Sequence, residues 1–425
     1  MSPFLLWRVR ACAAAWLMMA GSGSHAEVLT LAQAIARSME HNSDARLAAM
    51  AVDSARAAGL SAAAAPNPTL TLQSFNINPG VGIGSGKLRE KTIDSAVRID
   101  QLIERGGKRE LRVATAGHLE RAARDDLREG QRQLRLQVSL AYYDWQAAIA
   151  RLAVLRDSAA LCDATVEAAR RRLKAGDLAA ADVARAAVDA LRARNDVQQA
   201  ETDVAGARIA LMALLGEPER NDVEAAPAGV LAAPSELVAD DAALARRPDV
   251  LAAQDRLDAA YAARKLALAQ RSTDVTVGLQ VEHYPASAAN PQGSGNSYGI
   301  ALQIPLQWRY TYQGEIRTAE VAIDIASENL DKVRRLARAE LLLGSEQVQG
   351  AWQRLRRSED ELLPSAHQSA IAGEYAFNHG ALSIMDVLDV RRSERAAQLE
   401  TLAARNDYAK SLAAWRAALT ESSLP

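Results

Sequence analysis

Two aspartates near the end of the chain are placed to act on cations. Asp386 and Asp389 stand three residues apart, so on a helix they lie on one face. Repeated around the axis of a multi-copy assembly, they form stacked carboxylate rings that attract cations and disfavour anions. The alternative is an ordinary solvated helix start, where the helix dipole favours acidic side chains.

The histidines and cysteines do not form a recognisable ligand set. None of the histidines beyond residue 26 has a His-x-x-x-His or similar spacing; they are His41, His118, His283, His367 and His379. Cys162 is the only cysteine beyond residue 26, so an internal disulfide or a cysteine-based metal cluster is not expected. We therefore predict that the protein binds no metal and no cofactor.

The sequence also lacks the common signals of enzymes and of nucleic-acid-binding proteins. It contains neither a glycine-rich phosphate loop nor a nucleophile elbow. The formal net charge is −2, which gives no electrostatic footprint for nucleic acid. We predict that the protein is not an enzyme and has no nucleic-acid partner.

The first 26 residues have the features of a secretory signal. Arg8 and Arg10 supply positive charge, an apolar stretch follows over residues 11–20, and Ser24-His25-Ala26 resembles a cleavage site. The apolar stretch is shorter than the ~20 residues that a spanning helix needs, which favours a cleaved signal over a membrane anchor. Because the rest of the chain has no longer apolar run, any membrane-spanning part must consist of strands, whose sequence signal is weaker.

Two glycine–aspartate pairs reveal an internal repeat. Gly176 precedes Asp182 by the same spacing with which Gly380 precedes Asp386. Other residues recur at nearly the same offset, namely Asp44 and Asp249, Ile99 and Ile304, Glu110 and Glu315, and Arg112 and Arg317. We predict a first structural repeat over 27–220, a proline-bearing linker over 221–240 and a second repeat over 241–425. Each repeat is expected to run helix, strand, strand, long helix, helix.

Four stretches alternate between apolar and polar residues with period two, which is typical of strands. They cover 69–73, 93–100, 274–282 and 299–306, the last one including Ile304 and Leu306. Segments rich in Gly, Asn, Pro and Ser, 76–91 and 285–296, are predicted as exposed loops between paired strands. A half-buried sheet in a soluble protein has the same pattern and stays an alternative.

The remaining sequence is helical in character. Thr30 and Gln33 have the spacing of a capping box at the first helix start, and Pro66 and Pro68 mark the end of that helical region. No proline interrupts 109–175. Apolar residues step through this segment by fours and threes, as in a coiled coil; they are Leu134, Val138, Ala141, Trp145, Ala148, Leu152 and Leu155.

Helices of this length need partners along their whole length. A helix over 109–175 reaches on the order of 100 Å, and a second long helix is predicted from Glu315 to about Asn378, with Pro364 as a possible kink. Four strands cannot close a transmembrane barrel, since known barrels begin at about eight strands. If the strands lie in a membrane, several chains must share one barrel, and the assembly is then a conduit.

These features resemble the TolC-type outer-membrane efflux family over essentially the whole chain beyond the signal. The segment from Gly380 to Asp389 is similar to the family's periplasmic tip, and Arg172 to Gly176 followed by Asp182 resembles the other tip. The resemblance implies a mainly α fold with a small β part, and a homotrimer with a 12-stranded β-barrel in the outer-membrane lipid. A 12-helix α-helical barrel would continue it into the periplasm. The implied partners are a periplasmic adaptor (membrane fusion) protein and an inner-membrane RND pump.

Two groups of segments resemble the CzcC-like heavy-metal branch of this family. One is Ile99–Arg109; the other comprises Arg247-Pro248-Asp249, 274–278, 304–306 and 313–316. The resemblance implies a passive conduit for heavy-metal cations. Two alternatives stay open, a drug or type I secretion channel and, in another class, a periplasmic coiled-coil adaptor or scaffold.

The resemblance also suggests roles for the tip residues. It implies that Asp386 and Asp389 narrow the channel. Gly176 and Gly380 are expected to permit the tight tip turns, since glycine commonly ends a helix in this way. The expected tip and adaptor contacts are Leu173, Gly176, Asp177, Asp182, Gly380, Ala381 and Leu382. Where the drug-type member carries an aromatic and a basic locking partner, this chain has Phe377 and Leu382, so the same hydrogen-bonded lock is not expected.

Overall fold

The computed structural model describes residues 27–77, 93–234, 241–286 and 291–419. The predicted secretory signal, most of the predicted loop 76–91 and part of the predicted linker 221–240 lie outside these residues. The described chain is mainly helical with a small amount of sheet, as the sequence predicted. Among the described helices, none combines the length and the apolar character needed to cross a lipid bilayer.

The chain forms two compact units, each built from segments of both sequence halves. Unit 1 comprises residues 1–47, 130–244 and 337–425, and unit 2 comprises 48–129 and 245–336. The element order is repeated along the chain, because a short strand, two helices, two strands and a long helical hairpin appear twice in succession. The boundaries of the two predicted repeats stay a prediction.

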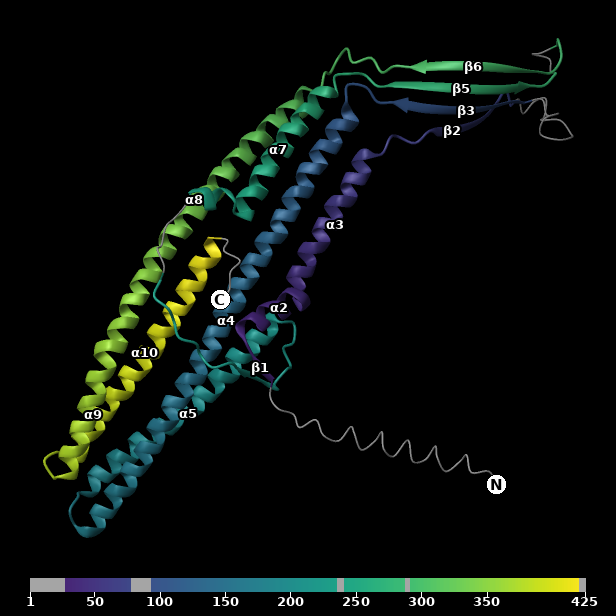
Figure 1. Cartoon of the computed structure of the whole chain (residues 1–425). Helices are drawn as coiled ribbons and strands as arrows, with labels where there is room; N and C mark the ends of the chain where they lie inside the picture. Colours follow the sequence, from purple (N-terminus) through teal and green to yellow (C-terminus); the bar gives the residue numbers. More distant parts are fainter. Residues whose placement is uncertain (1–26, 78–92, 235–240, 287–290, 420–425) are drawn as a thin grey trace, which may run out of the picture. The chain divides into compact units, whose positions relative to one another are not determined.

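Unit 2 contains a four-stranded antiparallel sheet in the order β2-β3-β5-β6 (Figure 1). Its strands are β2 (Thr69–Phe75), β3 (Asp94–Ile103), β5 (Val275–Tyr284) and β6 (Gly295–Gln303). The central pair β3–β5 joins strands from the two sequence halves, and each outer strand pairs with its neighbour along the chain. Unit 2 also holds most of α3 (Ser43–Ala63), α7 (Pro248–Ala269) and the first parts of the two longest helices.

Side chains separate cleanly onto the two faces of this sheet. Leu70, Ile99, Leu279 and Ile300 stand opposite one another in a row across all four strands. A second row is formed by Leu72, Val97, Val281 and Tyr298. All eight side chains are exposed, whereas the alternate positions carry mostly polar residues. The sheet therefore presents one continuous apolar face that no described segment of unit 2 covers.

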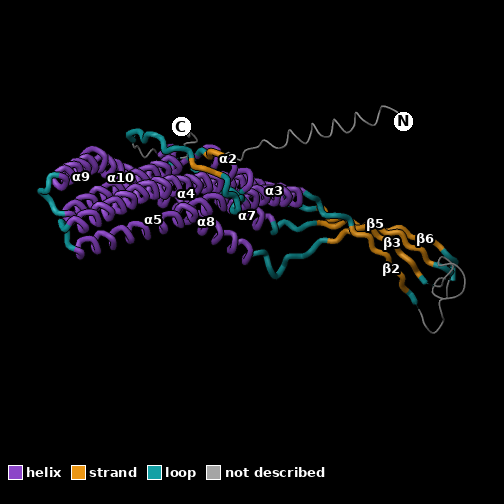
Figure 2. The backbone as a smooth tube through the Cα atoms, turned by 90° about the horizontal axis from the view of Figure 1, so that it is seen from below, coloured by secondary structure: helices purple, strands orange, loops and turns teal. Residues whose placement is uncertain are grey.

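Unit 1 contains two long helical hairpins (Figure 2). The first consists of α4 (Lys108–Ala175), whose first residues belong to unit 2, and α5 (Ala180–Leu214). The second consists of the end of α8 (Gln313–Arg357), a π-helical turn η2 (Ser358–Leu362), α9 (Leu363–Asn378) and α10 (Ile384–Ala418). The π-helical turn ends two residues before Pro364, near the predicted kink, where proline cannot donate the regular helical hydrogen bond.

The core of unit 1 is built on the predicted apolar seam of α4. Val138 and Trp145 are almost fully buried and pack against Leu211 and Met212 of α5. Tyr142 donates a hydrogen bond of 2.9 Å to the carbonyl of Leu29. That carbonyl belongs to β1 (Glu27–Leu29), which pairs in parallel with β4 (Val223–Ala225), its counterpart in the second half. Three-residue strands are too short to show a period in the sequence, and this pair was not predicted.

Two boundaries differ from the sequence prediction. The first helical region is split into α2 (Leu31–His41) and α3, because the side chain of Asn42 accepts the amide of Asp44 and its backbone is extended. β6 ends at Gln303, so Ile304 and Leu306 lie outside the strand; Pro305 between them cannot donate a ladder hydrogen bond. The capping box of Thr30 and Gln33 is confirmed.

Candidate functional site

The two hairpin tips of unit 1 are built alike. Gly176 and Gly380 both have left-handed backbones, with φ of 86° and 76°, which glycine adopts without strain. At the first tip the amide of Asp177 donates to the carbonyl of Arg172 at 2.9 Å, and at the second the amide of Ala381 donates to Ala376 at 2.8 Å. This is the same helix-ending motif twice, and it confirms that both glycines permit the tip turns.

The predicted contact residues lie around these turns. Leu173, Gly176 and Asp177 are exposed at the first tip, as are Gly380 and Ala381 at the second. Asp182 and Leu382 are partly buried. The structure therefore leaves most of these side chains accessible to another molecule, and their role in contacting an adaptor stays a prediction.

Asp386 and Asp389 both make local contacts within a single chain. The carboxylate of Asp386 accepts the hydroxyl of Ser383 at 2.7 Å and its amide at 3.0 Å, which completes a capping box at the start of α10. Asp389 pairs with Arg392 one turn later. Both are exposed at the start of α10. Within one chain, Asp386 thus caps the start of α10, as the helix-start interpretation expects. A ring of carboxylates would require several chains and stays a prediction.

Charged side chains connect the two hairpins near the tips. Arg392 on α10 contacts both Asp189 of α5 and Asp389. The guanidinium of Arg172 at the end of α4 lies 4.2 Å from the centre of the Phe377 ring at the end of α9, a cation–π contact. Sequence reasoning identified Phe377 but not its partner, because the contacting residues are about 200 positions apart and no local spacing connects them.

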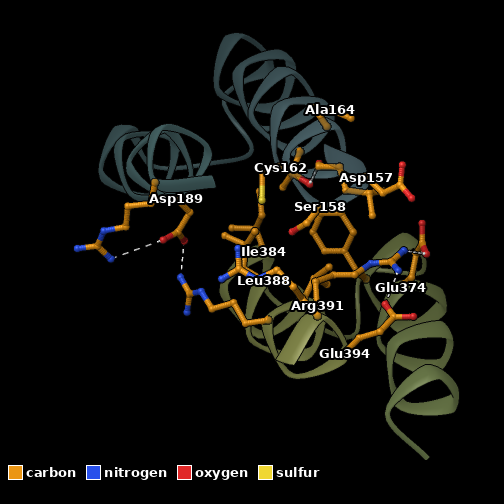
Figure 3. Close-up of a pocket in the computed structure, with 18 of the residues that line it drawn as sticks. Asp157, Ser158, Cys162, Ala164, Asp189, Glu374, Ile384, Leu388, Arg391 and Glu394 are labelled. Carbon is orange, nitrogen blue, oxygen red and sulfur yellow. Dashed lines mark hydrogen bonds and ion pairs between the residues drawn. The ribbon is translucent and has the colours of Figure 1, made fainter. Parts of the chain in front are cut away.

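A cavity of about 590 Å³ lies between α4, α5, α9 and α10 (Figure 3). Its lining includes the apolar residues Ile384 and Leu388 together with Cys162. Burial raises the pKa of the Cys162 thiol, so the thiol is protonated at neutral pH and is a poor nucleophile and metal ligand. The cavity is a gap between helices rather than a reactive site.

Glu394 is the most buried acidic group at this cavity. It accepts a hydrogen bond from Nδ1 of His367 at 2.8 Å and another from Arg391 at 2.9 Å. Burial alone raises the pKa of Glu394, but the hydrogen bonds from His367 and Arg391 outweigh it and hold the pKa below its ordinary value. The hydrogen bonds from Ser383 likewise lower the pKa of Asp386.

The hairpin of α9 and α10 is therefore expected to loosen in acid. A lowered carboxyl pKa stabilises the folded hairpin at pH values above the ordinary range of about 4, and this stability is lost as the pH falls through the lowered pKa. Hydrogen exchange of α10 amides, compared with α5 at the same pH, should show a selective loss of protection below about pH 4. Glu394→Gln should reduce this pH dependence, and equal behaviour of α5 and α10 would contradict the assignment.

A buried ion pair joins β3 and β5 to the helices in unit 2. The ammonium of Lys108, whose side chain is 5% exposed, donates to Asp274 at 2.7 Å and to the carbonyl of Ser272 at 2.8 Å. The amide of Arg105 also donates to Asp274. Burial raises the pKa of Asp274, but the hydrogen bonds from Lys108 and Arg105 outweigh it and leave the pKa below its ordinary value. These contacts fix the turn after β3 against the start of β5.

Gly278 lies opposite Asp100 in the pairing of β3 and β5. A Cβ at this position would clash with the carboxylate of Asp100, which is paired with Arg98 at 2.8 Å. The residues that resemble the heavy-metal branch thus include several that hold strands to helices. This structural role is one explanation of their similarity.

Comparison with known proteins places these features in a family. A family model described as outer membrane efflux protein matches residues 34–217 and 240–421. The chain is 27% identical over 309 residues to the cobalt-zinc-cadmium resistance protein CzcC of Cupriavidus metallidurans, covering 72% of each chain. It is 26% identical to the outer membrane efflux protein BepC of Brucella suis, covering 73% of this chain and 65% of BepC.

The fold is also shared with solved structures. The outer membrane protein VceC of Vibrio cholerae superimposes with a TM-score of 0.75 at 18% identity, covering 92% of this chain and 95% of that one. At this identity the likeness concerns the fold. This chain therefore shares its fold with a solved outer membrane protein.

Proposed function

Since the chain belongs to the outer membrane efflux protein family, we propose that it is the channel subunit of a tripartite efflux system for heavy-metal cations. The protein is located in the outer membrane and extends into the periplasm of a Gram-negative cell. Its family and fold are those of channel proteins. The proposal concerns the assembly, the cargo and the partners.

The exposed apolar face of the sheet is the main observation that supports the proposal. In the row that crosses all four strands, Leu279 on the inner strand β5 is 60% exposed and Ile300 on the outer strand β6 is 82% exposed. Such a face is costly in water and favourable in lipid. The outer strands β2 and β6 each have one edge without a partner among the described strands, and unpaired backbone groups in lipid cost several kcal/mol each. If further copies of the chain supplied strands to these edges, the apolar face would lie in lipid without leaving backbone groups unpaired.

Three copies of this sheet give a barrel of 12 strands, which lies in the size range of known outer-membrane barrels. The long helices support the same assembly, because α4 alone has 68 residues and is longer than one compact core can cover. Lateral packing of the hairpins from three chains would extend the barrel as a tube. Outer-membrane lipid then surrounds the strands, and the tube reaches into the periplasm.

Similarity to CzcC favours heavy-metal cations as the cargo. The similarity to BepC is of nearly equal identity, so a drug or secretion channel is the second candidate. A periplasmic adaptor (membrane fusion) protein and an inner-membrane RND pump are the proposed partners. We propose that the adaptor contacts the two tips, where Leu173, Asp177 and Ala381 are exposed.

The cargo is tested by deleting the gene in its host. Growth is titrated against cobalt, zinc, cadmium, nickel and copper salts, and against a panel of hydrophobic drugs and detergents. The proposal expects hypersensitivity to one or more metals alone, restored by the intact gene on a plasmid. Hypersensitivity to drugs and detergents alone would overturn the metal cargo and leave the channel assignment standing.

We also propose that Asp386 and Asp389 form the carboxylate constriction of the assembled channel. Replacing both by asparagine removes six negative charges from a trimer while keeping side chains of the same size. Single-channel conductance should rise and the cation-to-anion permeability ratio should fall by about a factor of two or more. Asp407→Asn, an exposed change elsewhere on α10, is the matched control. A double variant indistinguishable from this control would refute the constriction.

A further inference from the structure

A histidine of the first sequence half meets two aspartates of the second within unit 2. His118 lies on α4, and Asp255 and Asp258 lie three residues apart on one face of α7. One ligand atom from each of the three side chains lies within 4.8 Å of the others. Nδ1 of His118 is 3.4 Å from a carboxylate oxygen of Asp255. This grouping is invisible in the sequence, where His118 and Asp255 are 137 residues apart.

The donor set is suited to a divalent transition metal. Imidazole nitrogen suits zinc, cobalt and nickel, and carboxylate oxygen completes mixed sites for the same ions. Three protein ligands leave room for water in the remaining positions. The side chains of His118 and Asp255 are 26% and 16% exposed, so a hydrated ion can reach them.

A cation already contacts this group from within the chain. Nε of Arg121 donates to Asp255 at 2.9 Å, and its Nη2 contacts Nδ1 of His118. Nδ1 of His118 thus lies beside both the guanidinium of Arg121 and the carboxylate of Asp255. A metal ion bound here would use the lone pair of this nitrogen. The Arg121 side chain is 51% exposed and can swing into solvent without breaking a packed core.

The neighbouring arginines pair with other acids, so the carboxylate of Asp258 is available to a metal ion. Its carboxylate accepts a long hydrogen bond of 3.4 Å from Gln254, the one contact found for it among the described residues. The nearby arginines bind other acids, since Arg124 contacts Glu120 and Arg256 contacts Asp126. Arg121 pairs with Asp255, and no cation partner of Asp258 is found among the described residues, so a divalent ion would neutralise the remaining negative charge.

We propose that His118, Asp255 and Asp258 form an exchangeable binding site for a divalent transition-metal cation, which competes with the guanidinium of Arg121 for the same donors. Arg121 thereby weakens the site and favours release of the ion. The proposal rests on these contacts alone and does not require that the channel exports metals.

The test is a titration of the purified full-length protein in detergent with Co²⁺, followed by calorimetry and by the visible absorption of the ion. Saturable binding of about one Co²⁺ per chain is expected. Arg121→Gln should bind Co²⁺ about tenfold more tightly, because the competing cation is gone. His118→Ala and Asp258→Asn should each weaken binding by about tenfold or more. The exposed histidine variant His379→Ala is the control and should bind as the unmodified protein does.

Two outcomes would overturn the site. One is the absence of saturable Co²⁺ binding in both the unmodified protein and Arg121→Gln. The other is binding that persists unchanged in Asp258→Asn and His118→Ala, which would place the ion elsewhere. Neither outcome bears on the cargo, because metal sensitivity of the deletion strain is measured separately.

Discussion

Leu279→Arg is expected to prevent the protein from accumulating in the outer membrane. Leu279 lies in the middle of the apolar face, between Ile99 and Ile300 in the same row. An arginine facing the middle of the bilayer costs about 2–4 kcal/mol, and a trimer would carry three of them. Fractionation should show the variant lost from the detergent-extracted outer-membrane fraction, with degraded or aggregated protein in its place.

Ser297→Arg is the matched control for this prediction. Ser297 stands opposite Glu282 on the other face of the sheet, so an arginine there gains an oppositely charged neighbour. It should reach the outer membrane at nearly the normal level. Equal loss of both variants would indicate general misfolding, and normal assembly of Leu279→Arg would contradict the lipid-facing assignment.

Asp274→Ala is expected to destabilise unit 2 by about 3 kcal/mol, the lower end of the range for removing one partner of a buried ion pair. Lys108 would keep its charge in a site that is 5% exposed and would retain the Ser272 carbonyl as its acceptor. Thermal unfolding of the purified protein, followed by circular dichroism, should show a clear drop in Tm. The double variant Lys108→Met/Asp274→Ala should recover part of it, since no charge is then left buried.

An exposed ion pair of the same unit provides the comparison. Asp126 and Arg256 are each about half exposed, and Asp126→Ala should change stability by less than about 1 kcal/mol. If Asp274→Ala and Asp126→Ala lower the stability equally, the ion pair of Lys108 and Asp274 has no special structural role. The similarity of these junction residues to the heavy-metal branch would then be explained better by function than by stability.

The sequence predicted the parts of the fold that depend on local patterns. The capping box at Thr30, the apolar seam through Val138 and Trp145, and the period-two strands are all encoded within a few residues. The end of β6 was placed too late because Ile304 and Leu306 continue the alternation, although Pro305 between them cannot join the ladder. The break at Asn42 was missed since only the folded chain shows its side chain replacing the helical contacts.

Contacts between the two sequence halves could not be predicted in the same way. Lys108 meets Asp274, Arg392 meets Asp189, and His118 meets Asp255, each across more than 130 residues. Ligand spacing relates only residues that are close in sequence, so it does not connect His118 with the aspartates of α7. The tip glycines were predicted correctly because a left-handed turn requires glycine for local reasons.

The central claim is that this chain forms a cation-conducting channel. The most direct test is to insert the purified protein into planar lipid bilayers and to record single-channel currents under a gradient of cobalt or zinc chloride. Discrete conductance steps and a reversal potential on the cation-selective side are expected. The absence of discrete channels from correctly folded protein, or a reversal potential on the anion-selective side, would contradict this claim.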